Sequence, residues 1–177
     1  GNDFDTLVFE EEFDVDGAPD PAVWNYDLGT GDNGWGNNES QYYTDRPENI
    51  IVEDGILKIT ARAEDFEGSA YTSSRIQSYQ KYEFQYGRVE IRAKLPTGGG
   101  TWPALWMLGA DFETNTWPAA GEIDIMEHRG NEQDRILGST HDPNNFAGNA
   151  RSVSTVVEGV SDDWHVYGIV WTEDAIT

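Results

Sequence analysis

The stretch YGRVEIRAKL, residues 86–95, has the alternation typical of a β-strand with one buried and one exposed face. Every second residue from Val89 to Leu95 is apolar, and every second residue from Arg88 to Lys94 is charged. Successive side chains of a strand point to opposite faces, so the apolar set shares one face and the charged set shares the other. This pattern predicts an antiparallel sheet that packs on a core with one side and meets water with the other.

Similar short apolar runs occur on both sides of this stretch. Residues 49–64, NIIVEDGILKITARAE, predict a hairpin that turns at Asp54-Gly55, a dipeptide suited to positive φ angles. No stretch keeps a helical period, and neither a repeat nor a Ser/Gly-rich linker divides the chain. We therefore predict an all-β fold, an antiparallel β-sandwich of the jelly-roll kind, as a single domain over residues 1–177. Further strands are predicted at Leu7–Phe13, Ser73–Tyr79, Trp102–Leu108, Glu122–Arg129, Arg135–His141, Val153–Gly159 and Trp164–Thr172.

The chain is strongly acidic, with 33 Asp and Glu residues against 11 Lys and Arg residues and a formal net charge of −22. Binding to nucleic acid or to an anionic membrane surface requires clustered Lys and Arg, so neither is expected as a partner. Aromatic residues make up 12% of the chain, which indicates a folded core rather than disorder. Cysteine is absent, which excludes disulfides and thiolate metal sites, and no apolar run is long enough to span a bilayer.

The segment GEIDIMEHRG, residues 121–130, places three acids on one predicted strand. Glu122 and Asp124 share a face by alternation, whereas Glu127 is out of phase by one residue. A β-bulge at Ile125-Met126 would insert one extra residue and return Glu127 to the face of the other two acids. The segment thus predicts a strand with three carboxylates in a row.

Such a row is suited to the cleavage of glycosidic bonds. With the bulge, the Cα atoms of Glu122 and Glu127 are expected about 13 Å apart, at about 3.3 Å per strand step. Side chains that lean toward each other close this to roughly 5 Å between carboxyls, the spacing of nucleophile and acid/base in retaining glycosidases. Crowding also separates the proton affinities of the carboxyls, as an ionised nucleophile and a protonated acid require. The alternatives are a solvated acidic strand and a hard-cation site, and the apolar opposite face, with Ile123 and Ile125, argues against the first.

Tryptophans near this strand indicate carbohydrate binding, because sugar rings lay their apolar faces on aromatic side chains. Trp102 and Trp106 are four residues apart in TWPALWML, on one side of a predicted strand. Trp117 is in the loop that leads into Glu122, and Trp35 is in a loop rich in Gly and Asn. We interpret these tryptophans as candidate platforms for sugar rings.

Three polar residues are further candidates, each with an alternative structural role. Asn38 either bonds sugar hydroxyls or completes the backbone of a turn. Arg75 is either an ion-pair partner or a ligand for a hydroxyl. His141 is either a structural residue at the end of a strand or a group that orients the leaving-group side of the site.

Several segments together resemble glycoside hydrolase family 16. GEIDIME, residues 121–127, resembles the bulged ExDxxE signature of the family, and TWPALWML, WGNNESQYYT, SSRIQS and YGRVEIRAKLPTGGGTWPA resemble its laminarinase branch. The resemblance extends from about Leu7 to Thr177. It implies a concanavalin-like jelly roll with a concave groove, and retaining endo-hydrolysis of β-glucans with 1,3 linkages, mixed-linkage β-1,3-1,4-glucans included. Complete members continue past the segment that ends at Thr177, so we expect further strands beyond it.

The resemblance also implies a role for individual residues. Glu122 matches the nucleophile, Asp124 the residue that tunes it, and Glu127 the acid/base. The positions that match the lining of the groove, or the histidine beside the site, are Asn38, Arg75, Trp102, Trp106 and His141.

A structural calcium is a further implication of the resemblance. Glu12 and the backbone of Gly55 match two of its ligands, and the third ligand in the family is a C-terminal Asp that this sequence does not reach. No cofactor is expected for catalysis itself.

The leading hypothesis is therefore a secreted, monomeric endo-β-1,3-glucanase whose partner is a β-glucan. A lichenase resembles it but lacks the extra residue that Met126 supplies. A hydrolase of agar-type galactans shares the bulge, but sulfated substrates need cationic groove residues that this acidic chain lacks. A non-catalytic glucan-binding lectin on the same fold typically loses one of the acids, and here all three are present. The start GNDFDTLVFE has no signal-peptide pattern, so secretion is expected from the resemblance alone.

Overall fold

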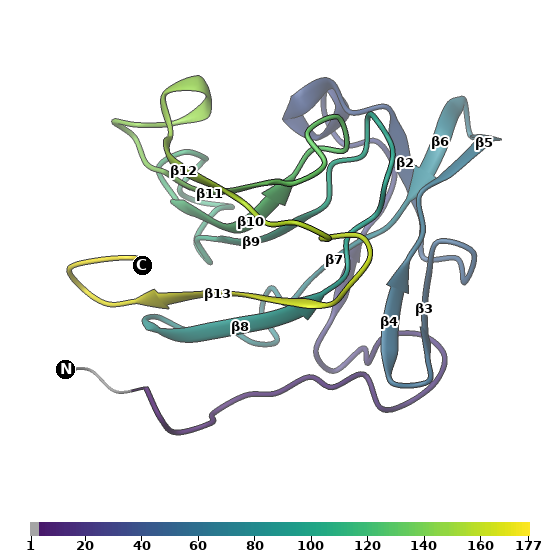
Figure 1. Ribbon diagram of the computed structural model, residues 1–177. Helices are drawn as coiled ribbons and strands as arrows, with labels where there is room; N and C mark the ends of the chain where they lie inside the picture. The colour runs from purple at the N-terminus through teal and green to yellow at the C-terminus, as the bar shows by residue number, and fades with distance from the viewer. Residues whose placement is uncertain (1–3) are drawn as a thin grey trace. The chain divides into compact units, whose positions relative to one another are not determined.

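The computed structural model describes residues 4–177, and its regular secondary structure is almost entirely β-strand (Figure 1). Contacts divide the described chain into two compact units, an N-terminal unit of residues 5–83 and a C-terminal unit of residues 84–177, to which residue 4 also belongs. None of the described residues forms a helix that is long and apolar enough to cross a membrane. The all-β prediction is confirmed, whereas the expectation of one domain over residues 1–177 stays a prediction.

The N-terminal unit consists of short strands joined by turns. Three pairs are antiparallel, β1 with β7, β3 with β4 and β5 with β6, and β2 lies parallel to β6. A helical turn, η1, precedes β2. The elements are β1 Asn25–Asp27, η1 Gly34–Asn38, β2 Gln41–Tyr43, β3 Ile50–Glu53, β4 Ile56–Ile59, β5 Arg62–Phe66, β6 Ser69–Ser73 and β7 Arg75–Gln77.

One local prediction for this unit is confirmed and another is wrong. The β3–β4 hairpin turns at Asp54 and Gly55, whose φ angles are 54° and 73°, as that dipeptide predicts. The strand predicted over Leu7–Phe13 is wrong, because these residues belong to no described strand and Leu7 and Val8 are 71% and 82% exposed. A run of apolar residues becomes a strand only where a second strand pairs with it, and tertiary structure decides that pairing.

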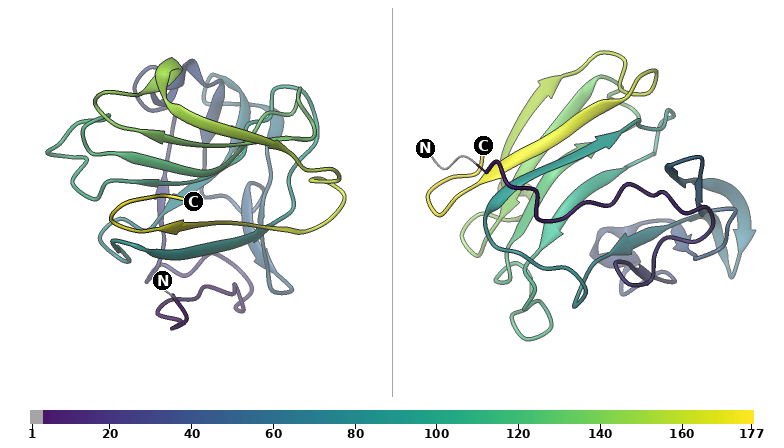
Figure 2. Two further views of the ribbon diagram at one scale, coloured as in Figure 1. Left: turned by 60° about the vertical axis from the view of Figure 1, so that its left-hand side comes forward. Right: turned by 90° about the horizontal axis from the view of Figure 1, so that it is seen from below.

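The C-terminal unit contains two antiparallel sheets, which Figure 2 shows from two further directions. The larger sheet has the order β12-β11-β10-β9, and the smaller one pairs β13 with β8. A short 3-10 turn, η2, precedes β12. The elements are β8 Gly87–Ala93, β9 Ala104–Leu108, β10 Glu122–His128, β11 Arg135–His141, η2 Ala147–Asn149, β12 Arg151–Val156 and β13 His165–Trp171.

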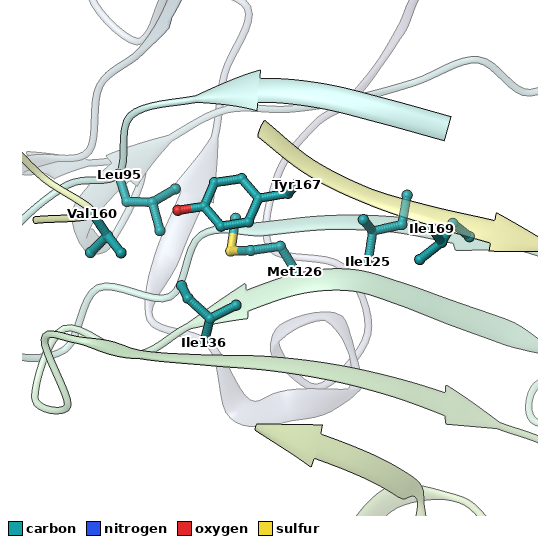
Figure 3. Close-up of a cluster of buried hydrophobic side chains, with 7 residues drawn as sticks. All are labelled: Leu95, Ile125, Met126, Ile136, Val160, Tyr167 and Ile169. Carbon is teal, nitrogen blue, oxygen red and sulfur yellow. The ribbon is translucent and has the colours of Figure 1, made fainter. Parts of the chain in front are cut away.

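The two sheets of the C-terminal unit pack on each other around one apolar core (Figure 3). In β8 the apolar residues are half-buried and the charged residues exposed, as the alternation in the sequence predicts. The sandwich arrangement is thereby confirmed within this unit. The buried core side chains come from β10, β11, β13 and two connecting segments: Leu95, Ile125, Met126, Ile136, Val160, Tyr167 and Ile169.

Two strands of this unit differ from the sequence prediction by two residues or more at an end. The strand predicted from Trp102 begins at Ala104, because Pro103 has no N–H to donate to a ladder. Trp102 therefore precedes β9, although the Pro103 carbonyl still accepts a hydrogen bond from the His128 N–H at 3.1 Å. The strand predicted over Val153–Gly159 is shifted toward the N-terminus and ends at Val156.

Candidate active site

The predicted bulge is present in β10 and is visible in both of its ladders. Opposite β11, Asp124 pairs with Ser139 and Glu127 pairs with Leu137, so three steps on β10 match two on its neighbour. Opposite β9 the register shifts between Asp124 and Met126. Both residues of the bulge enter the core, with Ile125 8% and Met126 1% exposed. The extra residue therefore returns Glu127 to the face that holds the other two acids.

Asp124 is the buried member of the three acids, with 5% of its surface exposed. Burial raises the pKa of its carboxyl to about 9, and a hydrogen bond with Glu122 and the negative charges of Glu122 and Glu127 act in the same direction. Asp124 is thus protonated at neutral pH and can donate a hydrogen bond to Glu122. The middle acid of the row is thus kept neutral by its surroundings.

Each of the two glutamates accepts a hydrogen bond from a different indole. The Nε1–H of Trp117 donates to Oε1 of Glu122 at 3.1 Å, and the Nε1–H of Trp102 donates to Oε2 of Glu127 at 2.9 Å. Both indoles come from segments that lie outside the strands and flank β9. Each carboxylate is therefore oriented by an indole, which is a rigid group. A reacting carboxylate needs such a fixed orientation.

His141 lies beside the first two acids, because it pairs with Glu122 in the ladder between β10 and β11. Its Nε2 is 3.0 Å from Oδ2 of Asp124 and 3.4 Å from Oε2 of Glu122. Ligand atoms of these three residues all lie within 4.8 Å of one another, a spacing at which they could also share a divalent cation. The neutral state of Asp124 opposes that use, because a protonated carboxyl is a poor cation ligand.

The tryptophans around the acids keep part of their surface open. Trp102 is 44%, Trp106 37% and Trp117 39% exposed. Trp106 pairs with Asp124 in the ladder between β9 and β10, so it lies on the strand next to the acids. Exposed indole surface beside the carboxylates fits the predicted role as platforms for sugar rings.

The model of the Glycosyl hydrolases family 16 matches residues 37–177, which include all three acids of β10. The chain belongs to this family. It is 48% identical over 175 residues to the beta-glucanase of Rhodothermus marinus, an alignment that covers 96% of this chain and 60% of that relative.

Two solved structures show the same fold. The laminarinase from Rhodothermus marinus has a TM-score of 0.91 at 47% identity, over 96% of this chain and 69% of that one. A non-specific endo-beta-1,3(4)-glucanase of the family, crystallised with glucan oligosaccharides, has a TM-score of 0.92 at 38% identity, over 99% of this chain and 71% of that one. This likeness confirms the predicted jelly-roll fold. The chain spans about 60% of the length of the curated relative, the beta-glucanase.

The other binding candidates of this family 16 chain lie in the N-terminal unit, in and near η1. Arg75 donates from Nε to Oδ2 of Asp27 at 2.7 Å, and its guanidinium lies 4.2 Å from the ring centroid of Trp35 and 5.3 Å from that of Tyr43. Arg75 thus makes the ion pair that was one of its two predicted roles. One face of Trp35 is covered by this guanidinium, so the interpretation of Trp35 as an open platform is wrong for that face.

Asn38 is the last residue of η1 and is exposed, with a φ of 54°. Its backbone N–H donates to the carbonyl of Asn33 at 3.0 Å, so it does complete a turn. Hydroxyl binding by Asn38 and Arg75 stays a prediction.

The two predicted calcium ligands lie in exposed parts of the N-terminal unit. Glu12 belongs to the segment before β1, and Gly55 is in the β3–β4 turn. Oδ1 of Asp16 accepts a hydrogen bond from the N–H of Asp54 at 3.1 Å, which places a further carboxylate at the same turn. Carboxylate and carbonyl oxygens are the donors that Ca²⁺ prefers, so the chemistry of the set fits the ion.

Sequence reasoning missed Phe146 and Ala147, in the loop between β11 and β12. Phe146 contacts Trp117 with ring centroids 5.7 Å apart, and the N–H of Ala147 reaches His141. The only signal in the sequence is an aromatic residue in an otherwise polar loop, which does not reveal its partner.

Proposed function

We propose that the protein is a retaining endo-hydrolase of β-1,3-glucans, with Glu122 as nucleophile and Glu127 as acid/base. One observation carries the proposal: the bulge of β10 brings three acids to one face, and the middle one has its pKa raised to about 9. The relatives named a beta-glucanase and a laminarinase support the substrate class. The three acids are all present, which favours an enzyme over a glucan-binding lectin.

The chemistry would follow the two steps of a retaining glycosidase. Glu122 attacks the anomeric carbon while Glu127 donates its proton to the departing glycosidic oxygen, which breaks that bond and forms a glycosyl ester on Glu122. Glu127, now ionised, takes a proton from water as the water oxygen attacks the same carbon and frees Glu122. Asp124 keeps its proton throughout and donates a hydrogen bond that stabilises Glu122 whenever it is ionised.

Neutral glucans are the substrates that the charge of the protein favours. A net charge of −22 repels sulfated galactans, whereas an uncharged laminarin or mixed-linkage glucan meets no such barrier. The solved relative described as a non-specific endo-beta-1,3(4)-glucanase supports some tolerance of 1,4 linkages. Sugar rings would lie on Trp102, Trp106 and Trp117, with His141 as a polar contact. Hydroxyl binding by Asn38 and Arg75 is proposed for the N-terminal unit by itself.

Several accompanying properties belong to the same proposal. Catalysis needs no cofactor, and a structural Ca²⁺ binds at Glu12 and the carbonyl of Gly55. The protein acts as a secreted monomer on extracellular polysaccharide, without nucleic acid or membrane partners.

The proposal is tested by assaying the protein and its Glu122→Ser variant on laminarin, mixed-linkage glucan, agarose and carrageenan. We expect the unaltered protein to release sugar from laminarin first, and the variant to lose hydrolysis while it still binds laminarin oligosaccharides. NMR of the first product should show the β-anomer, because two displacements retain configuration. Undiminished hydrolysis by Glu122→Ser, or an initial α-anomer, would refute the assigned chemistry.

A further inference from the structure

The loop of residues 142–150, between β11 and β12, contacts two side chains beside the acidic row through two consecutive residues. It leaves the sheet directly after His141 and returns to it at Arg151. Phe146 contacts Trp117, and Ala147 contacts His141. From outside the acidic row, Trp117 hydrogen-bonds Glu122 and His141 closely approaches it.

The contact of Ala147 fixes the protonation pattern of the His141 ring. The backbone N–H of Ala147 donates to Nδ1 of His141 at 3.1 Å. Nδ1 can accept this bond only with its lone pair, so the proton of the neutral ring resides on Nε2. Nε2–H then donates to Oδ2 of Asp124, 3.0 Å away, and faces Oε2 of Glu122 at 3.4 Å.

The backbone at Ala147 is in an unusual conformation. Its φ is 49°, in the left-handed region that residues other than Gly, Asn and Asp rarely adopt. Unfavourable backbone angles persist where the surroundings hold them, and they gather near functional sites. At Ala147 this backbone conformation occurs together with the hydrogen bond from its N–H to Nδ1 of His141.

The contact of Phe146 with Trp117 supports Oε1, the other carboxylate oxygen of Glu122. The Phe146 ring meets the indole of Trp117 edge to face, at 5.7 Å between centroids and 86° between planes. The same indole lies against the His141 ring, 5.7 Å between centroids. Its Nε1–H donates to Oε1 of Glu122 at 3.1 Å. Trp117 thus contacts two rings while it orients the carboxylate.

The loop itself is held in shape at its base. The carboxylate of Asp142 accepts hydrogen bonds from the backbone N–H groups of Asn144 and Asn145, at 2.8 and 3.1 Å. Arg151, the first residue of β12, donates from Nη1 to the same carboxylate at 2.6 Å. Both ends of the loop are therefore joined by one side chain.

We propose that Phe146 and Ala147 are positioning residues for the nucleophile. Phe146 acts through Trp117 on Oε1 of Glu122, and Ala147 acts through the Nε2–H tautomer of His141 on Asp124 and Oε2 of Glu122. Asp142 keeps both residues in place. The reaction that they serve rests on the proposed function, whereas the contacts and the tautomer do not.

A comparison of Phe146 variants tests the first half of the proposal on laminarin. Phe146→Ala should lower kcat by about tenfold or more while KM changes less than about twofold, because the nucleophile is misplaced rather than the sugar lost. Phe146→Tyr, which keeps the ring, should restore kcat. Val156→Ala, an exposed residue of β12 outside the site, is the matched control and should behave as the unaltered protein. An unchanged kcat in Phe146→Ala, or an equal loss in the control, would overturn this assignment.

Nitrogen-15 NMR of the histidine rings tests the second half without any assay of activity. We expect the proton of His141 on Nε2 in the unaltered protein, and a mixture of tautomers in Asp142→Ala, where the loop is released. A proton on Nδ1 in the unaltered protein, or an unchanged tautomer in Asp142→Ala, would contradict the proposal. Should the protein cleave none of the glucans, the proposed function fails while this measurement still decides the tautomer.

Discussion

Two clusters of polar side chains lie largely inside the protein, one in each compact unit, and they balance charge in opposite ways. In the N-terminal unit, the guanidinium of Arg46 donates to Asn49, Glu64 and Thr72, and Asn49 and Thr72 are completely buried. In the C-terminal unit, Glu122 and Glu127 lie beside the buried Asp124, without any Lys or Arg among the described partners of these three acids.

The difference separates a polar cluster that stabilises the fold from one suited to chemistry. Hydrogen bonds from Thr72 and Arg46 lower the pKa of Glu64, so its charge is satisfied in the folded state. Burial and neighbouring acids raise the pKa of Asp124 to about 9, so the ionised form of this carboxyl is disfavoured. A pKa raised by burial and like charges is typical of active sites, as at Asp124. A network in which opposite charges are paired, as around Arg46, satisfies buried donors and acceptors and stabilises the fold.

The largest expected effect concerns the acid/base and leaves the fold intact. Glu127→Gln should lower the hydrolysis of laminarin by about 10²–10⁴-fold, because the leaving oxygen no longer receives a proton. The free energy of unfolding should stay the same or rise, because glutamine keeps the size of the side chain and cannot add a negative charge to the row of acids. Steady-state kinetics together with urea unfolding measure both, and a parallel loss of stability and activity would contradict the division between the clusters.

The Arg46 cluster should show the reverse behaviour. Arg46→Ala leaves the buried Asn49 and Thr72 with fewer partners, which we expect to cost about 2–3 kcal/mol of unfolding free energy. Activity per folded molecule should remain within about twofold, because none of these groups is placed in the proposed reaction. Denaturant unfolding and assays corrected for the folded fraction test this, and an undiminished midpoint would show that the network is dispensable.

The dependence of stability on pH should separate the clusters further. Between the ordinary pKa of 3.8 and about 9, Asp124 keeps a proton in the folded protein that the unfolded chain has lost. The folded state then binds more protons, so stability falls as pH rises across that window. Asp124→Asn should remove this slope, so between pH 3.8 and about pH 9 its unfolding free energy should fall less than that of the unaltered protein.

Glu64 has the opposite sign, because its pKa is lowered in the folded state. Its contribution is present above the ordinary pKa of 4.5 and is lost as pH falls through the lowered value. Thermal melts from acid to alkaline pH would show the two slopes of stability with pH in the unaltered protein. The Asp124→Asn and Glu64→Gln variants should each lose one of them. A variant of Asp124 as sensitive to alkali as the unaltered protein would contradict the raised pKa.

The smallest effect is expected at an exposed ion pair, which serves as a reference for both clusters. Lys58 donates to Glu53 at 3.0 Å with both side chains nearly half exposed. Lys58→Met should change the unfolding free energy by less than about 1 kcal/mol, because solvent and salt screen the pair. A loss comparable with that of Arg46→Ala would show that burial is not what distinguishes the N-terminal cluster.

Local patterns in the sequence predicted much of the site and some of the fold. The alternation in residues 86–95, the turn at Asp54-Gly55 and the bulge at Ile125-Met126 are all present in the structure. These features could be predicted because they depend on the period of a strand and on backbone angles that nearby residues set. Glu127 was placed with Glu122 and Asp124 by the same reasoning.

Tertiary structure alone decided which residues meet across the chain. It left Leu7–Phe13 without a strand partner, covered a face of Trp35 with Arg75, and directed Phe146 onto Trp117. It also buried Asp124, and that burial is the largest cause of the rise of its pKa, to which the neighbouring acids add. A sequence specifies the face of a strand through its own period, but the depth of a side chain and its partners depend on elements that other parts of the chain supply.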